Sequence, residues 1–187
     1  GIWYNTHSKW KLGDFMSTIK VENLTGITSG ANANKIIVPA GQTLYAPGHV
    51  IQVISGERTG MSATGGTSYV DTGLSASITP TSTSSKILVS VDMYFTFRTA
   101  TTAERQADFR LLRGSTEVAF QRINQWTASS SSVHYFGKMS SFEKLDSPST
   151  TSAIEYKTQM KLNAGSADIF LSHDNAINTI TLMEIAG

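Results

Sequence analysis

The clearest pattern in the chain is a regular alternation of apolar and polar residues from Lys86 to Phe97. A period of two held over about a dozen residues is typical of a half-buried antiparallel β-strand, because successive side chains point to opposite faces of the sheet. The face expected to be buried carries six apolar side chains: Ile87, Val89, Val91, Met93, Phe95 and Phe97.

Other segments predict further strands. Residues 153–162 alternate again, Val50–Ile54 is a short apolar run, and residues 177–185 alternate more loosely. Phe109–Arg113 and Val118–Phe120 flank a Gly-Ser-Thr sequence, which is a hairpin signal. Turn signals recur about every ten residues, as in β-sandwiches and jelly rolls.

No segment has convincing helical periodicity, and we expect residues 101–108 to form a loop. The fold prediction is therefore all-β: an antiparallel β-sandwich, or jelly-roll-like head, over residues 48–187. Residues 1–47 differ, since Ile2–Thr6 and Trp10–Leu12 suit the arms of a hairpin and the apolar residues after them are sparse. We predict an N-terminal hairpin and extended stalk there, whose apolar residues are best buried against copies of themselves.

Composition supports a packed β-protein. Hydrophobic residues make up 40% of the chain, and Ser and Thr about a quarter, a mixture that suits pleated strands better than helices. A net charge of +1 with scattered Lys and Arg argues against nucleic-acid binding. The chain has no cysteine, which excludes disulfides and thiolate metal sites, and no apolar stretch long enough to span a bilayer.

Candidate catalytic motifs are weak. The Asp71-Thr72-Gly73 triplet is the active-site sequence of aspartic proteases, but those enzymes need two such carboxylates, and Gly73 also suits a tight turn. His173-Asp174 suits a turn cap better than a cation site, and His49 is a candidate only for a metal on a symmetry axis. We predict no enzyme activity, no catalytic residue, no cofactor and no bound metal, with polysaccharide cleavage as the enzymatic alternative.

Binding is the more plausible activity. Residues 99–106 and 124–132 are expected to be the longest polar loops of the head, and loops on a rigid scaffold are where recognition usually occurs. The second loop carries Trp126, the one weak candidate for receptor binding, whose ring suits a sugar face. The alternative is that Trp126 packs against a neighbouring strand or subunit.

Several stretches, taken in order, resemble bacteriophage tail-fibre proteins, above all the fibre tips of marine phages. They are Gly1–Thr6, Met16–Val21, Asn34–Leu44, Gly48–Val53, Ser68–Leu74, Ser77–Pro80, Ser84–Val89, Leu145–Thr151 and Ile180–Ile185. The chain lacks the long amino-terminal region by which complete fibres attach to the tail. It is therefore expected to be a fragment of a fibre, a separate tip protein or a related capsid decoration protein.

The resemblance implies a homotrimeric structural protein on the exterior of a virion that takes part in host-surface adsorption. Its expected partners are other virion proteins of the tail or capsid and a glycan or protein on the host cell. Neither nucleic acid nor membrane insertion is expected. The alternatives are a capsid decoration or head-fibre protein and a polysaccharide depolymerase.

Overall fold

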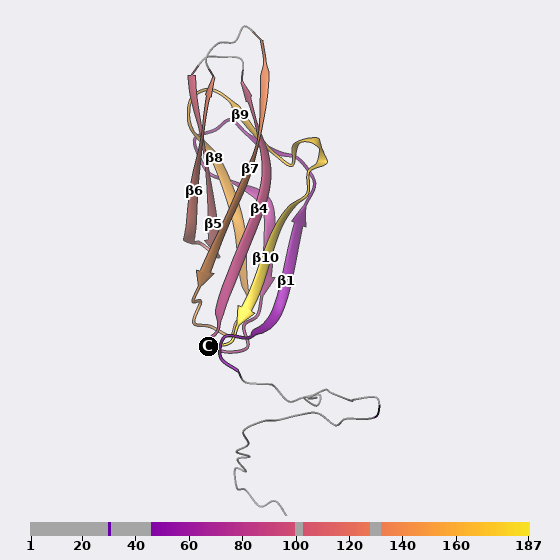
Figure 1. Cartoon of the computed structure of the whole chain (residues 1–187). Coiled ribbons are helices and arrows are strands. Elements are labelled where there is room, and N and C mark those ends of the chain that lie inside the picture. Colours follow the sequence, from indigo (N-terminus) through magenta and orange to yellow (C-terminus); the bar gives the residue numbers. More distant parts are fainter. Residues whose placement is uncertain (1–29, 31–45, 100–102, 128–131) are drawn as a thin grey trace, which may run out of the picture. The chain divides into compact units, whose positions relative to one another are not determined.

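The alternating segments form β-strands in the computed structural model, which describes residues 30, 46–99, 103–127 and 132–187 (Figure 1). The strands of this part of the chain are β1 (Val50–Arg58), β2 (Ser62–Thr64), β3 (Val70–Ile78), β4 (Lys86–Thr99), β5 (Ala103–Arg113), β6 (Thr116–Thr127), β7 (His134–Asp146), β8 (Ile154–Ala164), β9 (Asp168–Leu171) and β10 (Asn178–Ile185). A short 3-10 turn, η1 (His173–Asn175), separates β9 from β10.

The strands form two antiparallel sheets. In sheet A, β4 pairs along one side with β7, and along the other with β10 and then β9. The same sheet ends with β1 beside β10 and β2 beside β9. Sheet B has the order β3-β8-β5-β6. The order β1-β10-β4-β7 in sheet A facing β3-β8-β5-β6 in sheet B is that of a jelly roll, which confirms the predicted all-β sandwich.

The predicted strand of residues 86–97 forms the centre of the core. All six apolar residues on its inner face are fully buried. They meet inward side chains of sheet B, and the ring of Phe95 lies 4.7 Å from that of Phe109 and 5.5 Å from that of Phe97. The alternation in residues 153–162 is confirmed too, because Tyr156, Thr158 and Met160 of β8 face inward and are fully buried.

The predicted loops of residues 101–108, 99–106 and 124–132 are wrong at residues 99, 103–108 and 124–127, which lie in strands, while residues 100–102 and 128–131 lie outside the described residues. Residues 103–113 form β5, residues 116–127 form β6, and the two strands pair from Ala103–Thr127 to Arg113–Thr116. The outward positions Glu104, Gln106 and Asn124 are polar because they face solvent. A strand whose outer face is exposed to solvent near the sheet edge therefore has a sequence as polar as that of a loop.

The Asp71-Thr72-Gly73 triplet is not a turn between two strands. It lies inside β3, where the pairing with β8 skips from Asp71 to Ser75 and forms a bulge. Gly73 has φ +80°, so the left-handed backbone expected of this glycine is present, but in a bulge. A β-carbon there would lie 2.4 Å from Nη1 of Arg58, whose guanidinium crosses the bulge and donates to Gly60 O and Ser62 Oγ.

The side chain of Asn178 replaces backbone hydrogen bonds of sheet A at the point where η1 interrupts the strands. Its buried side chain accepts a hydrogen bond from the backbone N–H of Tyr94 (2.5 Å) and donates to the Ala176 carbonyl (3.3 Å) and to Ser172 Oγ. These bonds replace those that a continuous strand would make. The His173-Asp174 pair, expected to cap a turn, lies in this 3-10 turn.

The sandwich has two distinct ends. The proximal end holds the entry of the chain and its C-terminus, where Gly48 N donates to Ala186 O (2.7 Å) and Ala186 N to His49 O (2.9 Å). The distal end holds Thr99, where β4 finishes. The 14 residues of β4 span roughly 45 Å between the ends. Apart from Gly30 and residues 46 and 47, the predicted hairpin and stalk of residues 1–47 lies outside the described residues, so that division stays a prediction.

Candidate binding site at the distal end

A polar hollow of about 380 Å³ opens at the distal end, where the end of β4 lies near the connection from β8 to β9. Its lining comes from four separate stretches of the chain: Gly65, Arg98, Thr99, Val133, Leu162, Gly165, Ser166, Ala167 and Asp168. A hollow of this size accommodates a small ligand such as one or two sugar rings.

An ion pair lies at the hollow. Arg98 Nη1 and Asp168 Oδ2 are 2.9 Å apart, and both side chains remain more than 40% exposed. Hydrogen bonding to Asp168, and then to Tyr135, raises the pKa of the Arg98 guanidinium above its already high value. Planar charged groups of this kind, already oriented by one another, are suited to bind the hydroxyls of a polar ligand.

The base of the hollow is rigid. The buried Arg105 donates from Nε (3.1 Å) and Nη2 (2.9 Å) to Thr99 Oγ1, and Thr99 in turn donates to the Ser166 carbonyl (3.1 Å). Gly165 has φ +85°, and a β-carbon there would lie 2.4 Å from the Glu104 carbonyl oxygen. The connection between β8 and β9 therefore passes too close to β5 for any other residue, and this closeness fixes Ser166 and Asp168 in position.

Aromatic rings flank the ion pair on the outer face of sheet A. Tyr135 is 54% exposed and its ring lies 5.5 Å from that of His173, which lies 5.8 Å from that of Phe170. Sequence reasoning missed this group, because its members come from β7, β9 and η1 and form no local motif. No signal in the sequence reveals the group, because Tyr135 comes to lie beside Arg98 only through the pairing of β7 with β4.

The predicted receptor-binding residue Trp126 lies in β6, not in a loop, and its partner in β5 is Glu104. Its ring is 67% exposed, so within one chain it is not buried against a neighbouring strand. It lies on the outer face of sheet B and does not line the hollow. The structure thus does not bring Trp126 together with Arg98 and Asp168.

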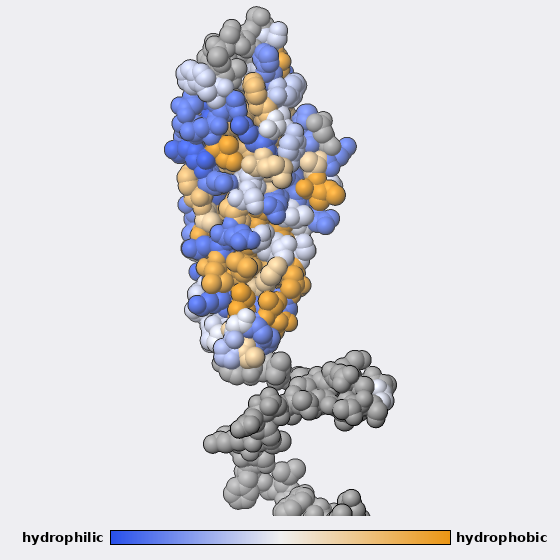
Figure 2. All heavy atoms as spheres, in the orientation of Figure 1, coloured by the Kyte–Doolittle hydropathy of each residue, from blue (hydrophilic) through white to orange (hydrophobic). Residues whose placement is uncertain are grey.

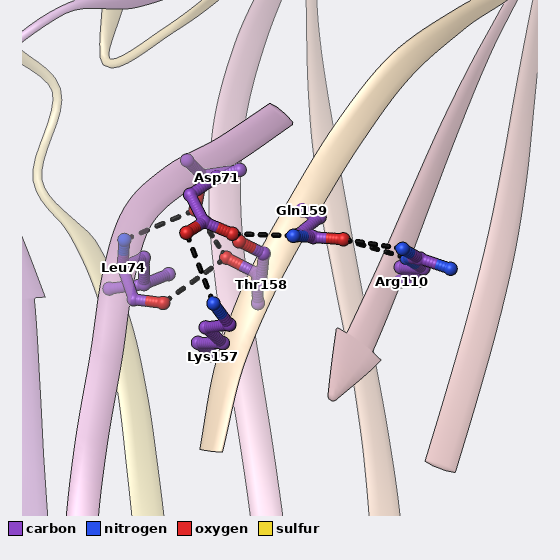
Figure 3. Close-up of polar contacts among 7 residues, drawn as sticks. Asp71, Leu74, Arg110, Lys157, Thr158 and Gln159 are labelled. Atoms are coloured by element: carbon purple, nitrogen blue, oxygen red, sulfur yellow. Dashed lines mark hydrogen bonds and ion pairs between the residues drawn. The ribbon is translucent and has the colours of Figure 1, made fainter. Parts of the chain in front are cut away.

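Asp71 belongs to a charged network on the outer face of sheet B (Figure 3). Its carboxylate accepts hydrogen bonds from Gln159 (2.6 Å) and Lys157 (3.1 Å), and both bonds lower its pKa, the Gln159 bond most. Gln159 accepts from the guanidinium of Arg110 (2.9 and 2.6 Å). A small hollow of about 160 Å³ lies beside Asp71, but these partners are those of a solvent-facing ion-pair network.

The histidines of the described residues lie in separate segments of the fold. His49 lies at the proximal end, where its Nδ1 contacts the Ala46 carbonyl oxygen. His134 begins β7, stacking on Phe136 at 5.9 Å, and His7 lies outside the described residues. Among the residues that the structure describes, no three His, Asp or Glu side chains are grouped so as to hold a metal ion. The same residues contain no helix long and apolar enough to cross a membrane.

No model of a known protein family matches the sequence, and the search of curated proteins gives no significant match. Among solved structures, the chain is similar to that of the infectious bursal disease virus Gx strain, with 12% identity and a TM-score of 0.36 over 82% of this chain and 37% of that one. The VP2 subviral particle of the same virus gives a TM-score of 0.39 with the same identity and coverage.

The infectious bursal disease virus Gt strain gives a TM-score of 0.28 at 12% identity, over 88% of this chain and 46% of that one. The chain thus spans less than half the length of these viral proteins. Likenesses this distant carry no argument about relationship or function.

Proposed function

We propose that this chain is a structural protein of the exterior of a virus particle, the distal part of a trimeric bacteriophage tail fibre that adsorbs to the host surface. The observation that carries the proposal is the separation of the two ends. The chain enters beside its own C-terminus at the proximal end, and the polar hollow opens at the distal end, roughly 45 Å away along β4. Attachment to the particle and contact with the host then use opposite ends.

The jelly-roll strand order supports a structural role in a virus particle. Jelly rolls are common in viral capsid domains and in lectins, where a rigid sandwich presents loops to a partner. The finer placement on a phage tail fibre rests on the sequence resemblance. The same architecture would serve a capsid decoration protein that docks to the shell through residues 1–47, and imaging of particles separates the two placements.

The ligand that fits the distal hollow best is a surface glycan of the host cell. The hollow is lined mainly by polar groups, with the Arg98–Asp168 pair, the Ser166 backbone and the exposed Tyr135 ring close by. Sugars are bound by such planar hydrogen-bonding groups beside an aromatic face. Each site would bind weakly, and three sites on one fibre would give the avidity needed for adsorption.

Competition for adsorption tests this function. Excess purified chain should reduce the binding of phage to host cells, and Arg98→Ala should weaken that competition by about tenfold or more. Lys144→Ala, an exposed change on β7 near the proximal end, is the control and should compete like the wild type. If the wild-type chain neither binds cells nor competes, the adsorption function is wrong. If both variants compete fully, the distal hollow is not the site.

The proposed role is non-enzymatic. The one carboxylate that the sequence motifs offer for catalysis, Asp71, forms an ion pair with Lys157 on the outer face of sheet B. Incubation with host polysaccharide, followed by measurement of reducing ends, is expected to give no release above the buffer control. Release that increases with time and protein concentration would show a depolymerase instead.

A further inference from the structure

The outer face of sheet A changes character along its length. Near the proximal end, Val53 of β1 pairs with Met183 of β10, Met183 pairs with Leu88 of β4, and Leu88 pairs with Leu145 of β7. Paired residues of antiparallel strands share a face, so these four side chains form one continuous apolar row across the sheet. We call them the apolar row.

The next row on the same face, toward the distal end, is polar. It consists of Ser55, Thr181, Ser90 and Glu143, paired in the same order across the four strands. The outer face of an antiparallel sheet is commonly polar, and apart from single exposed residues such as Met139 and Tyr135 on β7, the apolar row is where this face departs from that pattern across four strands. Buried hydrophobic packing within the chain does not explain the row, since Val53 is 54% and Leu145 49% exposed.

The apolar row extends toward the proximal end. There Val50, itself 49% exposed, pairs with Ile185 on the same face, and Ile185 pairs in turn with the exposed Lys86. Figure 2 shows apolar side chains gathered near the proximal end of this face of the sandwich. A contiguous exposed apolar patch beside polar residues marks a protein contact surface.

From this arrangement we infer that the apolar row is the surface through which the heads of neighbouring copies of this chain pack together. The occupant is a second copy because of where the chain enters. Residues 1–45 join the head at Ala46, at the proximal end, where Gly48 is bonded to Ala186. If these residues hold three copies together, as the proposed function requires, the proximal parts of the heads are brought close to one another. The apolar row lies on that part of each head.

The charges of the head permit such packing. The chain has a net charge of only +1, and the charged network of Asp71, Asp108, Arg110 and Arg122 lies on the outer face of sheet B, away from the apolar row. Copies that meet through sheet A therefore need not bury these charges, and the charged residues nearest the apolar row, Lys86 and Glu143, lie at its proximal and distal edges. This inference rests on the proposed trimer, but it names a face that the trimer alone does not specify.

Cross-linking of single thiols tests the inference, and the natural absence of cysteine makes the experiment clean. Val53→Cys and Leu145→Cys place a thiol in the apolar row. Phe120→Cys is the matched control, because Phe120 is 48% exposed, lies on edge strand β6 and belongs to the outer face of sheet B. Each variant of the 187-residue chain is treated with a short bismaleimide, and native mass measurement records its oligomeric state.

The row variants should give covalently linked pairs of chains, with an initial rate about tenfold above that of Phe120→Cys, because association holds their thiols at high effective concentration. If the wild type is a trimer but the row thiols link no faster than the control, the trimer stands and the apolar row is not its contact. If the wild type is a monomer at every concentration, both the trimer and this inference are wrong.

Discussion

Glu184 shows how single polar residues hold the proximal end together. It is fully buried on the inner face of β10, yet its carboxylate accepts hydrogen bonds from Gln52 Nε2 (2.6 Å) and from the backbone N–H and hydroxyl of Thr81 (both 2.7 Å). Burial alone would raise its pKa, but the hydrogen bonds from Gln52 and Thr81 outweigh burial and lower the pKa below the ordinary 4.5. One carboxylate thus ties β1 and the β3–β4 connection to β10.

This lowered pKa predicts acid sensitivity. The ionised carboxylate stabilises the folded state fully above about pH 4.5, and the stabilisation is lost as the pH falls from there through the lower pKa of the folded protein. Glu184→Gln should lower the free energy of unfolding by about 1–3 kcal/mol at pH 7 and reduce its dependence on pH below 4.5.

Urea unfolding at a series of pH values measures both effects of Glu184→Gln. Glu143→Gln, an exposed change on β7, serves as the control and should leave the wild-type profile nearly unchanged. Equal profiles for Glu184→Gln and Glu143→Gln would contradict this role of Glu184.

The strands themselves were predictable where one face is buried. β4 and β8 alternate because their inner faces enter the core, and the sequence shows that alternation directly. The prediction of loops around Glu104 and Asn124 was wrong because the outer faces of β5 and β6 are polar there, so the sequence does not show the apolar alternation of a strand. The bulge in β3 was missed for another reason: Gly73 signals a left-handed residue, but only the partner strand β8 decides whether it lies in a turn or a bulge.

Three Gly→Ala variants test whether the contact between Gly73 and Arg58 stabilises the bulge in β3. Gly73→Ala should lower the free energy of unfolding by about 2 kcal/mol or more, because it strains a left-handed residue and displaces Arg58. Gly114→Ala, at φ +57° in the open β5–β6 turn, should cost about 1 kcal/mol from strain alone. Gly66→Ala has room and should change little. Thermal unfolding that ranks Gly73→Ala no lower than Gly114→Ala would show that the Arg58 contact is unimportant.

At the scale of the whole molecule, the sandwich places the entry of the chain at one end and a polar hollow at the other. The fold class followed from the sequence, whereas the distal hollow did not, because its lining comes from segments as far apart as Gly65, Arg98 and Asp168. No local spacing encodes such a site, since only the pairing of β4 with β9 brings Arg98 to Asp168. Trp126, the one aromatic residue of its polar stretch, was predicted to bind the receptor but lies outside the hollow.

The apolar row was likewise hidden in the sequence. Leu88 lies at an outward position of an otherwise regular strand. It is recognised as part of an apolar surface only because the structure aligns Val53, Met183 and Leu145 with it across sheet A. A role on the outside of a particle, with the heads of three copies in contact, gives these exposed side chains a use.

The most direct test of this role is electron microscopy of purified phage particles decorated with an antibody against the head, residues 46–187. The account predicts label at the far ends of the tail fibres, away from their attachment to the tail. Label spread over the capsid shell would show a decoration protein instead, and particles without label would contradict a virion protein of either kind.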